Sequence, residues 1–252
     1  MAFEVIVLGA SGTYPTPGAA CAGYLLRSNG SDVWVDSGPG TFANLQRHAN
    51  FWELDGLVLS HLHPDHLLDF YPFYYALRYS GVVDRPPGFK VFAPSPGERH
   101  LTKMISFDEP CGFDGYIDFS QISEESAITL GAFEFEFSRS VHPIETLSMR
   151  ITSEGRTLVY SSDTGRTTTL ADVAKGAHCL ICEATLQTPD EGLSEVHLTA
   201  QEAGAVAAEA GVEKLVLTHL WPGLEAEQSV EQAAKEFSGE IIVGADNLRV
   251  IV

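Results

Sequence analysis

The sequence predicts an α/β fold in which two β-sheets pack against each other with helices outside. Apolar, strand-like runs dominate both halves of the chain, and helix-like stretches follow each set of strands. An apolar sheet face must be buried against another layer, so this order favours a layered sandwich. No linker, low-complexity segment or short-period repeat interrupts the 252 residues, and we therefore expect a single domain over residues 1–252.

In the first half, apolar runs bounded by Gly, Pro or Asn predict strands. Two of them form the arms of an expected hairpin around Asn29-Gly30. The segment 94–122 has the least regular pattern and is a candidate cover for a cleft. The expected strands of this half are 5–8, 24–26, 33–36, 57–59 and 91–93, and the expected helices are 41–48 and 67–79.

The second half shows the same alternation of element types. Residues 133–137 alternate strictly between Phe and Glu, as a half-buried strand does. The alanine-rich stretch 199–210 predicts a helix with Thr199 or one of its neighbours as the cap and Gly211 at its end. The other expected strands are 147–151, 157–161, 214–218, 241–243 and 248–251, and the other expected helices are 170–175 and 229–237.

Four potential metal ligands occur within six consecutive residues, directly after an apolar strand-like run. Side chains two apart on an extended backbone point the same way, so His61 and His63 can close on one metal. Pro64 then bends the path, which lets Asp65 and His66 face a second metal. The chain has only nine histidines, so three in one hexapeptide indicate a metal site rather than a polar loop.

Three further candidate ligands, His142, Asp163 and His219, each follow a strand-like run. Singly, each would more often be a capping or surface residue. Together with the hexapeptide they make five His and two Asp, which suffice for two divalent cations that share a carboxylate. Ligation rich in imidazole suits Zn²⁺, and the ligand types leave Mn²⁺ and Fe²⁺ open.

The charge balance limits the substrates. The chain has 34 Asp and Glu against 15 Lys and Arg, which gives a formal net charge of −19. Such a surface repels a phosphate backbone, and non-specific affinity for nucleic acid comes mainly from cationic contacts. Two bound divalent cations would offset about four of these charges locally, so a small anionic substrate fits, whereas a long polyanion does not.

Cysteine usage and hydropathy indicate the compartment. Four cysteines in a chain of this length do not suggest a disulfide scaffold. Cys179 and Cys182 have C-x-x-C spacing, but positions three apart on a strand face opposite sides, which predicts buried structural thiols rather than a metal pair. No span approaches ~20 apolar residues, and the first residues predict a strand rather than a signal peptide. We therefore expect a cytoplasmic protein without membrane contact.

The order His-x-His-x-Asp-His, then a lone His, an Asp in Ser-Asp-Thr and a late His resembles the metallo-β-lactamase fold superfamily. The resemblance covers nearly the whole chain and implies a four-layer αββα sandwich. It implies a role for Asp36, in Val35-Asp36-Ser37-Gly38, in supporting the ligand loop. It also implies that Asp163 bridges the metals, where the true β-lactamases have Cys. The resemblance assigns His61, His63 and His142 to the first metal and Asp65, His66 and His219 to the second.

Two further motifs resemble those of ribonuclease Z, the transfer RNA 3′-end endonuclease. Cys182-Glu183-Ala184-Thr185 is similar to its His-Glu-Ala-Thr loop, and His197-Leu198-Thr199 is similar to its His-Ser/Thr-Thr motif. The resemblance implies that His197 protonates the leaving oxygen and that Glu183 orients His197, because a departing alkoxide needs a proton.

The chain also departs from ribonuclease Z. The RNA-clamping arm of that family lies between the third ligand His and the bridging Asp, but only twenty residues separate His142 from Asp163 here. The early basic motif of that family is missing as well. The catalytic apparatus without the arm resembles that of compact relatives that act on small phosphodiesters, including cyclic nucleotides and cyclic phosphates.

We therefore expect a dinuclear metal-dependent phosphodiesterase in which activated water attacks a small anionic phosphodiester, with Asp65 or Asp163 as base and His197 as acid. The alternatives are a ribonuclease Z-type endonuclease, another hydrolase of the fold acting on a thioester, lactone or sulfate ester, and a non-enzymatic metal-binding domain. By analogy, a homodimer is an assembly to test.

The loop 9–13 lacks the ending of a phosphate-cradling loop and predicts only a turn. The helix-like stretch offers an aromatic wall for a nucleobase, with core packing as the other use of its residues: Tyr71, Phe73, Tyr74, Tyr75 and Tyr79.

Overall fold

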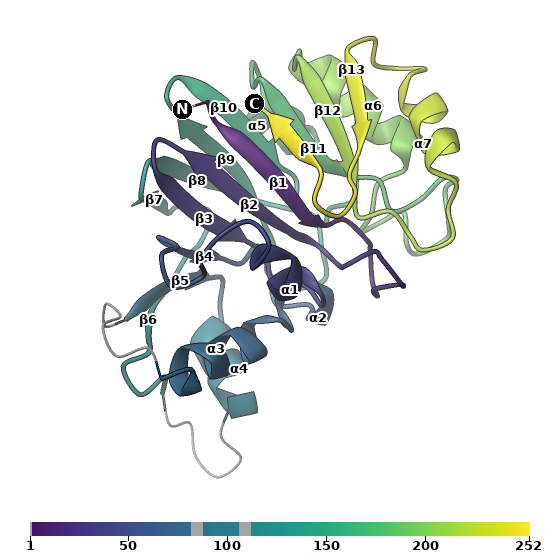
Figure 1. The fold of residues 1–252 in the computed structure, drawn as a ribbon. Helices are drawn as coiled ribbons and strands as arrows, with labels where there is room; N and C mark the ends of the chain where they lie inside the picture. Colours follow the sequence, from purple (N-terminus) through teal and green to yellow (C-terminus); the bar gives the residue numbers. More distant parts are fainter. Residues whose placement is uncertain (1, 82–87, 106–111) are drawn as a thin grey trace.

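The computed structural model describes residues 2–81, 88–105 and 112–252, and the strands of this part of the chain form two sheets of seven (Figure 1). In spatial order the first sheet contains β14 (Arg249–Ile251), β1 (Glu4–Gly9), β2 (Gly23–Ser28), β3 (Ser31–Val35), β4 (Gly56–Val58), β5 (Phe89–Ala93) and β6 (Ile117–Gln121). The second contains β13 (Glu240–Val243), β12 (Lys214–Thr218), β11 (Cys179–Glu183), β10 (Arg156–Tyr160), β9 (Leu147–Ser153), β8 (Phe133–Arg139) and β7 (Ala127–Leu130). The predicted α/β class with two sheets is confirmed.

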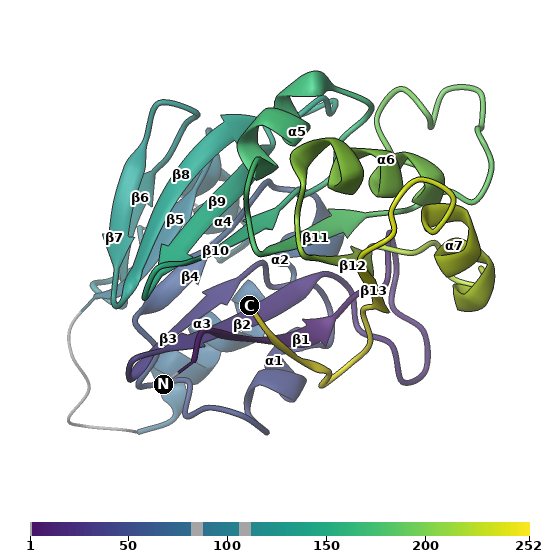
Figure 2. The same cartoon turned by 90° about the horizontal axis from the view of Figure 1, so that it is seen from above.

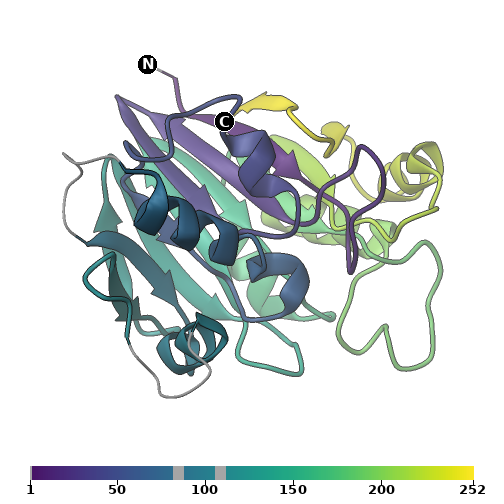
Figure 3. The ribbon, with the colours of Figure 1, turned by 60° about the horizontal axis from the view of Figure 1, so that its bottom comes forward.

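Helices cover the outer faces of both sheets, so the layers run helix, sheet, sheet, helix (Figures 2 and 3). The first sheet is covered by α1 (Thr41–Leu45), α2 (Pro64–Leu67), α3 (Phe70–Tyr79) and α4 (Gly97–Ile105). The second is covered by α5 (Thr168–Ala174), α6 (Ala200–Ala210) and α7 (Ala226–Ala233). This arrangement is the expected αββα sandwich.

Strand alternation divides the apolar side chains among three cores. In β1, Val5 and Val7 face the core between the sheets, whereas Ile6 and Leu8 face the helices of the first layer. Because successive side chains of a strand point to opposite faces, one short apolar run supplies two cores at once. This explains why β1 is apolar at every position from Val5 to Leu8.

The same alternation settles the C-x-x-C pair. Cys179 packs in the core between the sheets, and Cys182 packs on the other face, beneath the helices. Burial raises the pKa of the Cys179 thiol to about 12 and raises that of Cys182 as well. The prediction of buried structural thiols is confirmed.

Several strands run in the same direction and end at one edge of the sandwich. In the second sheet, β10, β11, β12 and β13 are parallel neighbours, and in the first sheet β3, β4, β5 and β6 are parallel neighbours. The carboxyl ends of parallel strands lie at the same edge, which is where open α/β sheets place ligands. Six of the seven predicted ligands follow the ends of β4, β10 and β12, and His142 follows β8.

Some expected boundaries were wrong. The helix expected over 67–79 is two helices, because Pro64 starts α2 and places Asp65 and His66 in its first turn. The helices expected over 41–48, 170–175 and 229–237 are α1, α5 and α7 with shifted ends. The irregular segment 94–122 contains α4 and the edge strand β6, while 106–111 lies outside the described residues. Strand β7 was not predicted, because its sequence Ala-Ile-Thr-Leu contains no continuous apolar run.

Within the described residues, no helix is both long enough and apolar enough to cross a membrane.

The contact between α6 and α7 depends on Gly204. A Cβ built on Gly204 would lie 2.4 Å from the carbonyl oxygen of Ala233, a backbone atom that cannot rotate away. We expect Gly204→Val to lower the free energy of unfolding by roughly 1–3 kcal/mol, the usual cost of overpacking. Urea denaturation measures the loss. Ala208→Val, at an exposed position of the same helix, is the control for helix propensity. Equal losses in both variants would contradict the close packing.

Candidate metal centre

The hexapeptide ligands lie just beyond the carboxyl end of β4. His61 and His63 meet His142, which follows β8, and Asp163, which follows β10. Their ligand atoms all lie within 4.8 Å of one another. His142 Nε2 is 3.0 Å from His63 Nδ1, and Asp163 Oδ2 is 3.8 Å from His61 Nε2. Three imidazoles and one carboxylate oxygen therefore point at a common centre.

A second group forms beside the first. It contains Asp65, His66, Asp163 and His219, again with ligand atoms within 4.8 Å of one another. Asp163 Oδ1 is 3.2 Å from His66 Nε2 and 3.5 Å from His219 Nε2, and His219 Nε2 is 3.1 Å from Asp65 Oδ2. Asp163 belongs to both groups, with Oδ2 toward one and Oδ1 toward the other. The structure thus brings all seven predicted ligands together.

Unpartnered buried atoms test whether this cluster suits cations. His61 Nε2, His66 Nε2 and Asp163 Oδ1 are buried and have no hydrogen-bond partner among the residues that the structure describes. Buried polar atoms are nearly always hydrogen-bonded, so three such atoms facing one another need another explanation. Lone pairs of imidazole and carboxylate are the donors that Zn²⁺ and related divalent cations accept. The residues present therefore fit two divalent metal ions.

The electrostatics of the cluster favour a neutral imidazole at His61 and an ionised carboxylate at Asp163, which are the forms that bind a metal. Burial holds the pKa of His61 well below its usual value, which keeps the imidazole neutral. Burial opposes the charge of Asp163, but His219 and His66 outweigh it and hold the pKa of this carboxyl well below its usual range. His66 behaves differently: burial lowers its pKa, but Asp163 and Asp65 raise it well above the ordinary value. A metal must therefore displace a proton from His66.

Asp36 supports the ligand loop from below, as the resemblance implied. Its carboxylate is fully buried and accepts hydrogen bonds from Ser60 N (2.7 Å), Ser60 Oγ (2.8 Å) and Tyr160 Oη (2.9 Å). It also lies 2.8 Å from His66 Nδ1. Because an ionised carboxylate only accepts, His66 donates through Nδ1, and its Nε2 is the atom directed at Asp163.

The N-terminal loop takes part in the site, which sequence reasoning missed. The backbone N–H of Thr13 donates to Asp65 Oδ2 at 2.9 Å. A Cβ on Gly12 would lie 2.9 Å from His219 Nδ1, so the loop passes directly over this ring. The prediction of a simple turn over 9–13 was incomplete. No local pattern indicates this role, because it arises from contact with residues far along the chain.

Glu183 and His197 form the predicted pair. Glu183 ends β11 and is fully buried, and its Oε1 lies 3.0 Å from His197 Nδ1. Burial opposes the charge on His197, but the hydrogen bond and charge of Glu183 raise the pKa of this imidazole above its usual value. Thr185 Oγ1 lies between Glu183 Oε2 (2.7 Å) and His219 Nδ1 (2.8 Å), a contact for which the sequence assigned no role.

The aromatic stretch divides between two environments. Phe73 and Tyr74 are fully buried in the core between α3 and the first sheet. Tyr75 and Tyr79 are 45% and 65% exposed and stack on each other with ring centroids 5.7 Å apart. A wall made of all five aromatics was therefore wrong, since core packing takes Phe73 and Tyr74.

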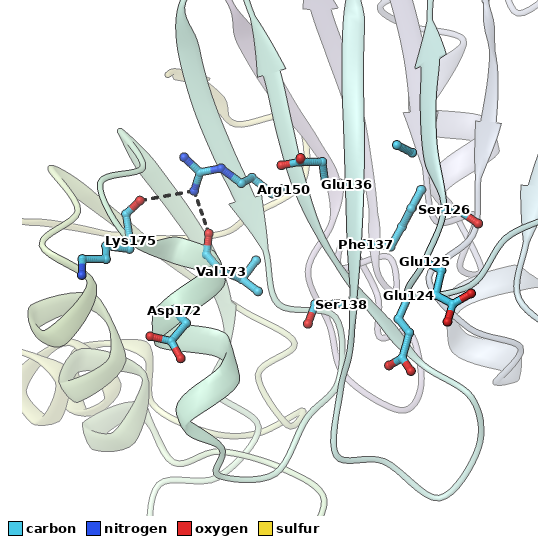
Figure 4. A pocket seen from close by; sticks show the side chains of 11 residues that line it. Glu124, Glu125, Ser126, Glu136, Phe137, Ser138, Arg150, Asp172, Val173 and Lys175 are labelled. Atoms are coloured by element: carbon cyan, nitrogen blue, oxygen red, sulfur yellow. Dashed lines mark hydrogen bonds between the residues drawn. The ribbon is translucent and has the colours of Figure 1, made fainter.

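A separate groove of about 530 Å³ lies on the outer face of the second sheet, between β7–β9 and α5 (Figure 4). Its Arg150 donates to the carbonyl oxygens of Val173 and Lys175. Its acidic lining residues are Glu124, Glu125, Glu136 and Asp172. The groove shares no residue with the two ligand groups, so it is not part of the candidate centre.

Comparison with known proteins gives a consistent result. A model of the beta-lactamase superfamily domain matches residues 31–220. An uncharacterized protein of Mycobacterium tuberculosis is 34% identical over 245 residues, which cover 94% of this chain and 88% of that protein. The ribonuclease Z of Thermobifida fusca is 26% identical over 311 aligned positions, covering 99% of this chain and 94% of that protein.

The probable metallo-hydrolase YhfI of Bacillus subtilis is similar in both sequence and structure. It is 28% identical over 240 residues, covering 94% of this chain and 95% of that protein. Its crystal structure matches with a TM-score of 0.88 at 26% identity, covering 99% of this chain and 100% of that chain. The match therefore extends over the whole sandwich.

The ligand groups predict a stability that depends on metal. We expect chelation to lower Tm and added Zn²⁺ to raise it by roughly 5–10 °C when free metal is about 100 times Kd, because binding stabilises only the folded chain. Differential scanning calorimetry measures the shift. His61→Ala should reduce it, whereas His100→Ala, an exposed histidine on α4, should retain it. Equal shifts in both variants would contradict the assignment of His61 to the centre.

Proposed function

This chain belongs to the beta-lactamase superfamily and is a metal-dependent hydrolase, and we propose that it is a dinuclear phosphodiesterase acting on small phosphodiesters such as cyclic nucleotides or cyclic phosphates. The observation that carries the proposal is the Glu183–His197 pair beside the two ligand groups. An acid next to paired metal sites suits a reaction that expels an alkoxide. We propose that residues 1–252 form one hydrolase domain.

Seven residues would hold the metals. His61, His63 and His142 would bind the first ion, Asp65, His66 and His219 the second, and Asp163 both. When bound, two such ions lower the pKa of water and neutralise charge on phosphate oxygens. Zn²⁺ is the metal we propose, because imidazole dominates the ligand set, and Mn²⁺ or Fe²⁺ are the alternatives to test.

The residues of the chain supply the proton transfers. Although burial opposes its charge, the imidazoles of His66 and His219 hold the pKa of Asp65 below its usual range. We propose that Asp65 or Asp163 receives the proton of the attacking water. His197 has its Nδ1–H engaged with Glu183 Oε1, so the protonated ring offers Nε2–H to the leaving oxygen. Against the opposing effect of burial, the hydrogen bond and charge of Glu183 raise the pKa of His197, which favours the protonated ring.

The short segment between His142 and Asp163 supports the proposal of a small substrate. In this segment β9 and β10 form a hairpin turning at residues 154–155. The alignment with the ribonuclease Z extends over 311 positions, whereas this chain has 252 residues. That ribonuclease Z therefore contains several tens of residues that have no counterpart here. The net charge of −19 and the lack of these extra residues favour a small phosphodiester over RNA as the substrate.

Two further parts of the proposal concern assembly and competing chemistry. We propose a homodimer as the assembly to test, by analogy with enzymes of this fold. The alternative substrates are RNA, thioesters, lactones and sulfate esters. Activity on bis-aryl phosphate and cyclic nucleotides, compared with thioester, lactone and sulfate ester, separates these classes. Turnover of a thioester or lactone far above that of any phosphodiester would overturn the proposal.

The acid role of His197 predicts a dependence on the leaving group. We expect His197→Ala to lower kcat by about 10²–10⁴ for phosphodiesters with an alkoxide leaving group, because such an oxygen needs a proton as it departs. A nitrophenolate leaves without protonation, so its turnover should fall much less. Steady-state kinetics across a series of leaving groups measures this slope.

The control for this series is His100→Ala, which should behave as the wild type with every leaving group. A uniform loss in His197→Ala, independent of the leaving group, would show that His197 binds or positions the substrate instead of protonating it.

A further inference from the structure

Thr185 lies just beyond the end of β11, and its side chain is fully buried. Its hydroxyl oxygen is 2.7 Å from Glu183 Oε2 and 2.8 Å from His219 Nδ1. His197 Nδ1 is farther away, at 3.3 Å, and has a shorter contact of its own with Glu183. One hydroxyl therefore connects the carboxylate that orients the acid to an imidazole of the second ligand group.

The direction of these hydrogen bonds follows from what each atom can donate. Glu183 Oε2 accepts only, so the single hydroxyl proton of Thr185 must point at it. If the proton pointed at His219 instead, two acceptor oxygens would face each other 2.7 Å apart in a buried site, which is costly. Thr185 Oγ1 is thus an acceptor toward His219, and His219 donates through Nδ1–H.

We propose that Thr185 is a positioning residue that holds His219 in its Nδ1-protonated tautomer and links the second ligand group to the Glu183–His197 pair. In that tautomer the lone pair of His219 is on Nε2, which lies 3.1 Å from Asp65 Oδ2 and 3.5 Å from Asp163 Oδ1, so a bound cation rather than a proton would have to separate these acceptor atoms. The inference rests on the proposed function, since it assigns Thr185 to the same site.

Two neighbouring contacts leave the His219 ring little freedom. The backbone of Gly12 lies so close that a Cβ there would be 2.9 Å from His219 Nδ1. Tyr24 Oη and Thr218 Oγ1 are 2.6 Å apart, which anchors the residue before His219 to the first sheet. The ring and the residue before it are thus placed by contacts other than Thr185, so we assign the hydroxyl of Thr185 to the choice of tautomer.

Glu183 is equally restrained, which makes it a fixed reference for the hydroxyl. Its carboxylate accepts from Thr164 N at 2.7 Å and Leu198 N at 3.1 Å, in addition to His197 and Thr185. Thr164 follows Asp163 directly, so one carboxylate is in contact with the residue next to the bridging Asp163, with the acid and, through Thr185, with His219.

The first ligand group has a different support, which gives the test its internal control. His142 Nδ1 lies 3.3 Å from the carbonyl oxygen of Val196, a backbone acceptor that a side-chain substitution leaves in place. Loss of the Thr185 hydroxyl should therefore weaken the second metal and spare the first.

The experiment compares Thr185→Val, which removes the hydroxyl at nearly constant volume, with Thr185→Ser, which keeps it. After a chelator has removed bound metal from the full-length chain, Zn²⁺ binding is followed by calorimetry and by metal content. We expect Thr185→Val to weaken the second ion by about 10–100-fold and to leave the first unchanged, as for other outer partners of metal-binding histidines. Thr185→Ser should restore wild-type binding.

A spectroscopic readout on the wild type makes the proposal independent of the variants. Long-range ¹H–¹⁵N spectra of the Zn²⁺-loaded protein report which nitrogen of each histidine has the proton, and His219→Ala identifies the His219 signal. We expect protonation at Nδ1. Protonation of His219 at Nε2, or wild-type affinity for both ions in Thr185→Val, overturns the proposal.

These outcomes are distinct from a failure of the proposed function. A wild type that binds two ions but does not hydrolyse phosphodiesters would contradict the substrate class and leave the role of Thr185 in metal binding intact. Normal phosphodiester turnover with His219 protonated at Nε2 would contradict the role of Thr185 and leave the proposed substrate class intact.

Discussion

The buried carboxylate of Asp36 is the contact on which the geometry of the metal centre depends. It lies at the end of β3 in the first sheet, and it receives hydrogen bonds from the ligand loop through Ser60 and from the second sheet through Tyr160. His66 donates to the same carboxylate and is thereby turned toward Asp163. Loss of this acceptor would leave several buried donors unpaired, at roughly 1–3 kcal/mol each. A single carboxylate thus joins both sheets and one ligand.

The strand ends around this carboxylate adopt a backbone conformation that only glycine enters freely. Asp36, Ser162 and His219 have φ values of 53°, 52° and 55°. Such residues cost about 1–3 kcal/mol and persist where surrounding contacts hold them. Glycine would relieve the strain, but each position needs its side chain: a carboxylate, a hydroxyl bonded to Ser60, and an imidazole. The site therefore retains strained residues at the edge where the strands end.

Local spacing and long-range contact explain what the sequence could and could not predict. His61 and His63 were predictable because two residues on one strand end share a direction. His142, Asp163 and His219 were grouped with them because each follows a strand-like run and because the order of the motifs resembles a known family, since no local rule places residues so far apart together. The continuous apolar run from Val5 to Leu8 indicated a strand, whereas strand β7 has no such run and was not predicted.

Thr13 and Thr185 illustrate the part that could not be predicted. Thr13 acts through its backbone N–H, which is the same in every residue except proline. Thr185 acts through a hydroxyl whose partners, Glu183 and His219, come from neighbouring strands β11 and β12. Neither role leaves a trace in composition or periodicity. The tertiary structure alone supplies these contacts.

Glu183, His197 and His219 also lie close enough together to suggest a third metal position, but their hydrogen bonds argue against it. The Glu183 carboxylate already accepts from its neighbours, namely Thr164 N, Thr185 N, Thr185 Oγ1, Leu198 N and His197 Nδ1. A cation there would have to displace these donors from a fully buried group, whereas the unpartnered atoms around Asp163 require no such loss. A carboxylate saturated by donors is suited to holding an imidazolium in place. The presence or absence of hydrogen-bond partners at buried atoms therefore assigns metals to the Asp163 cluster and a proton to His197.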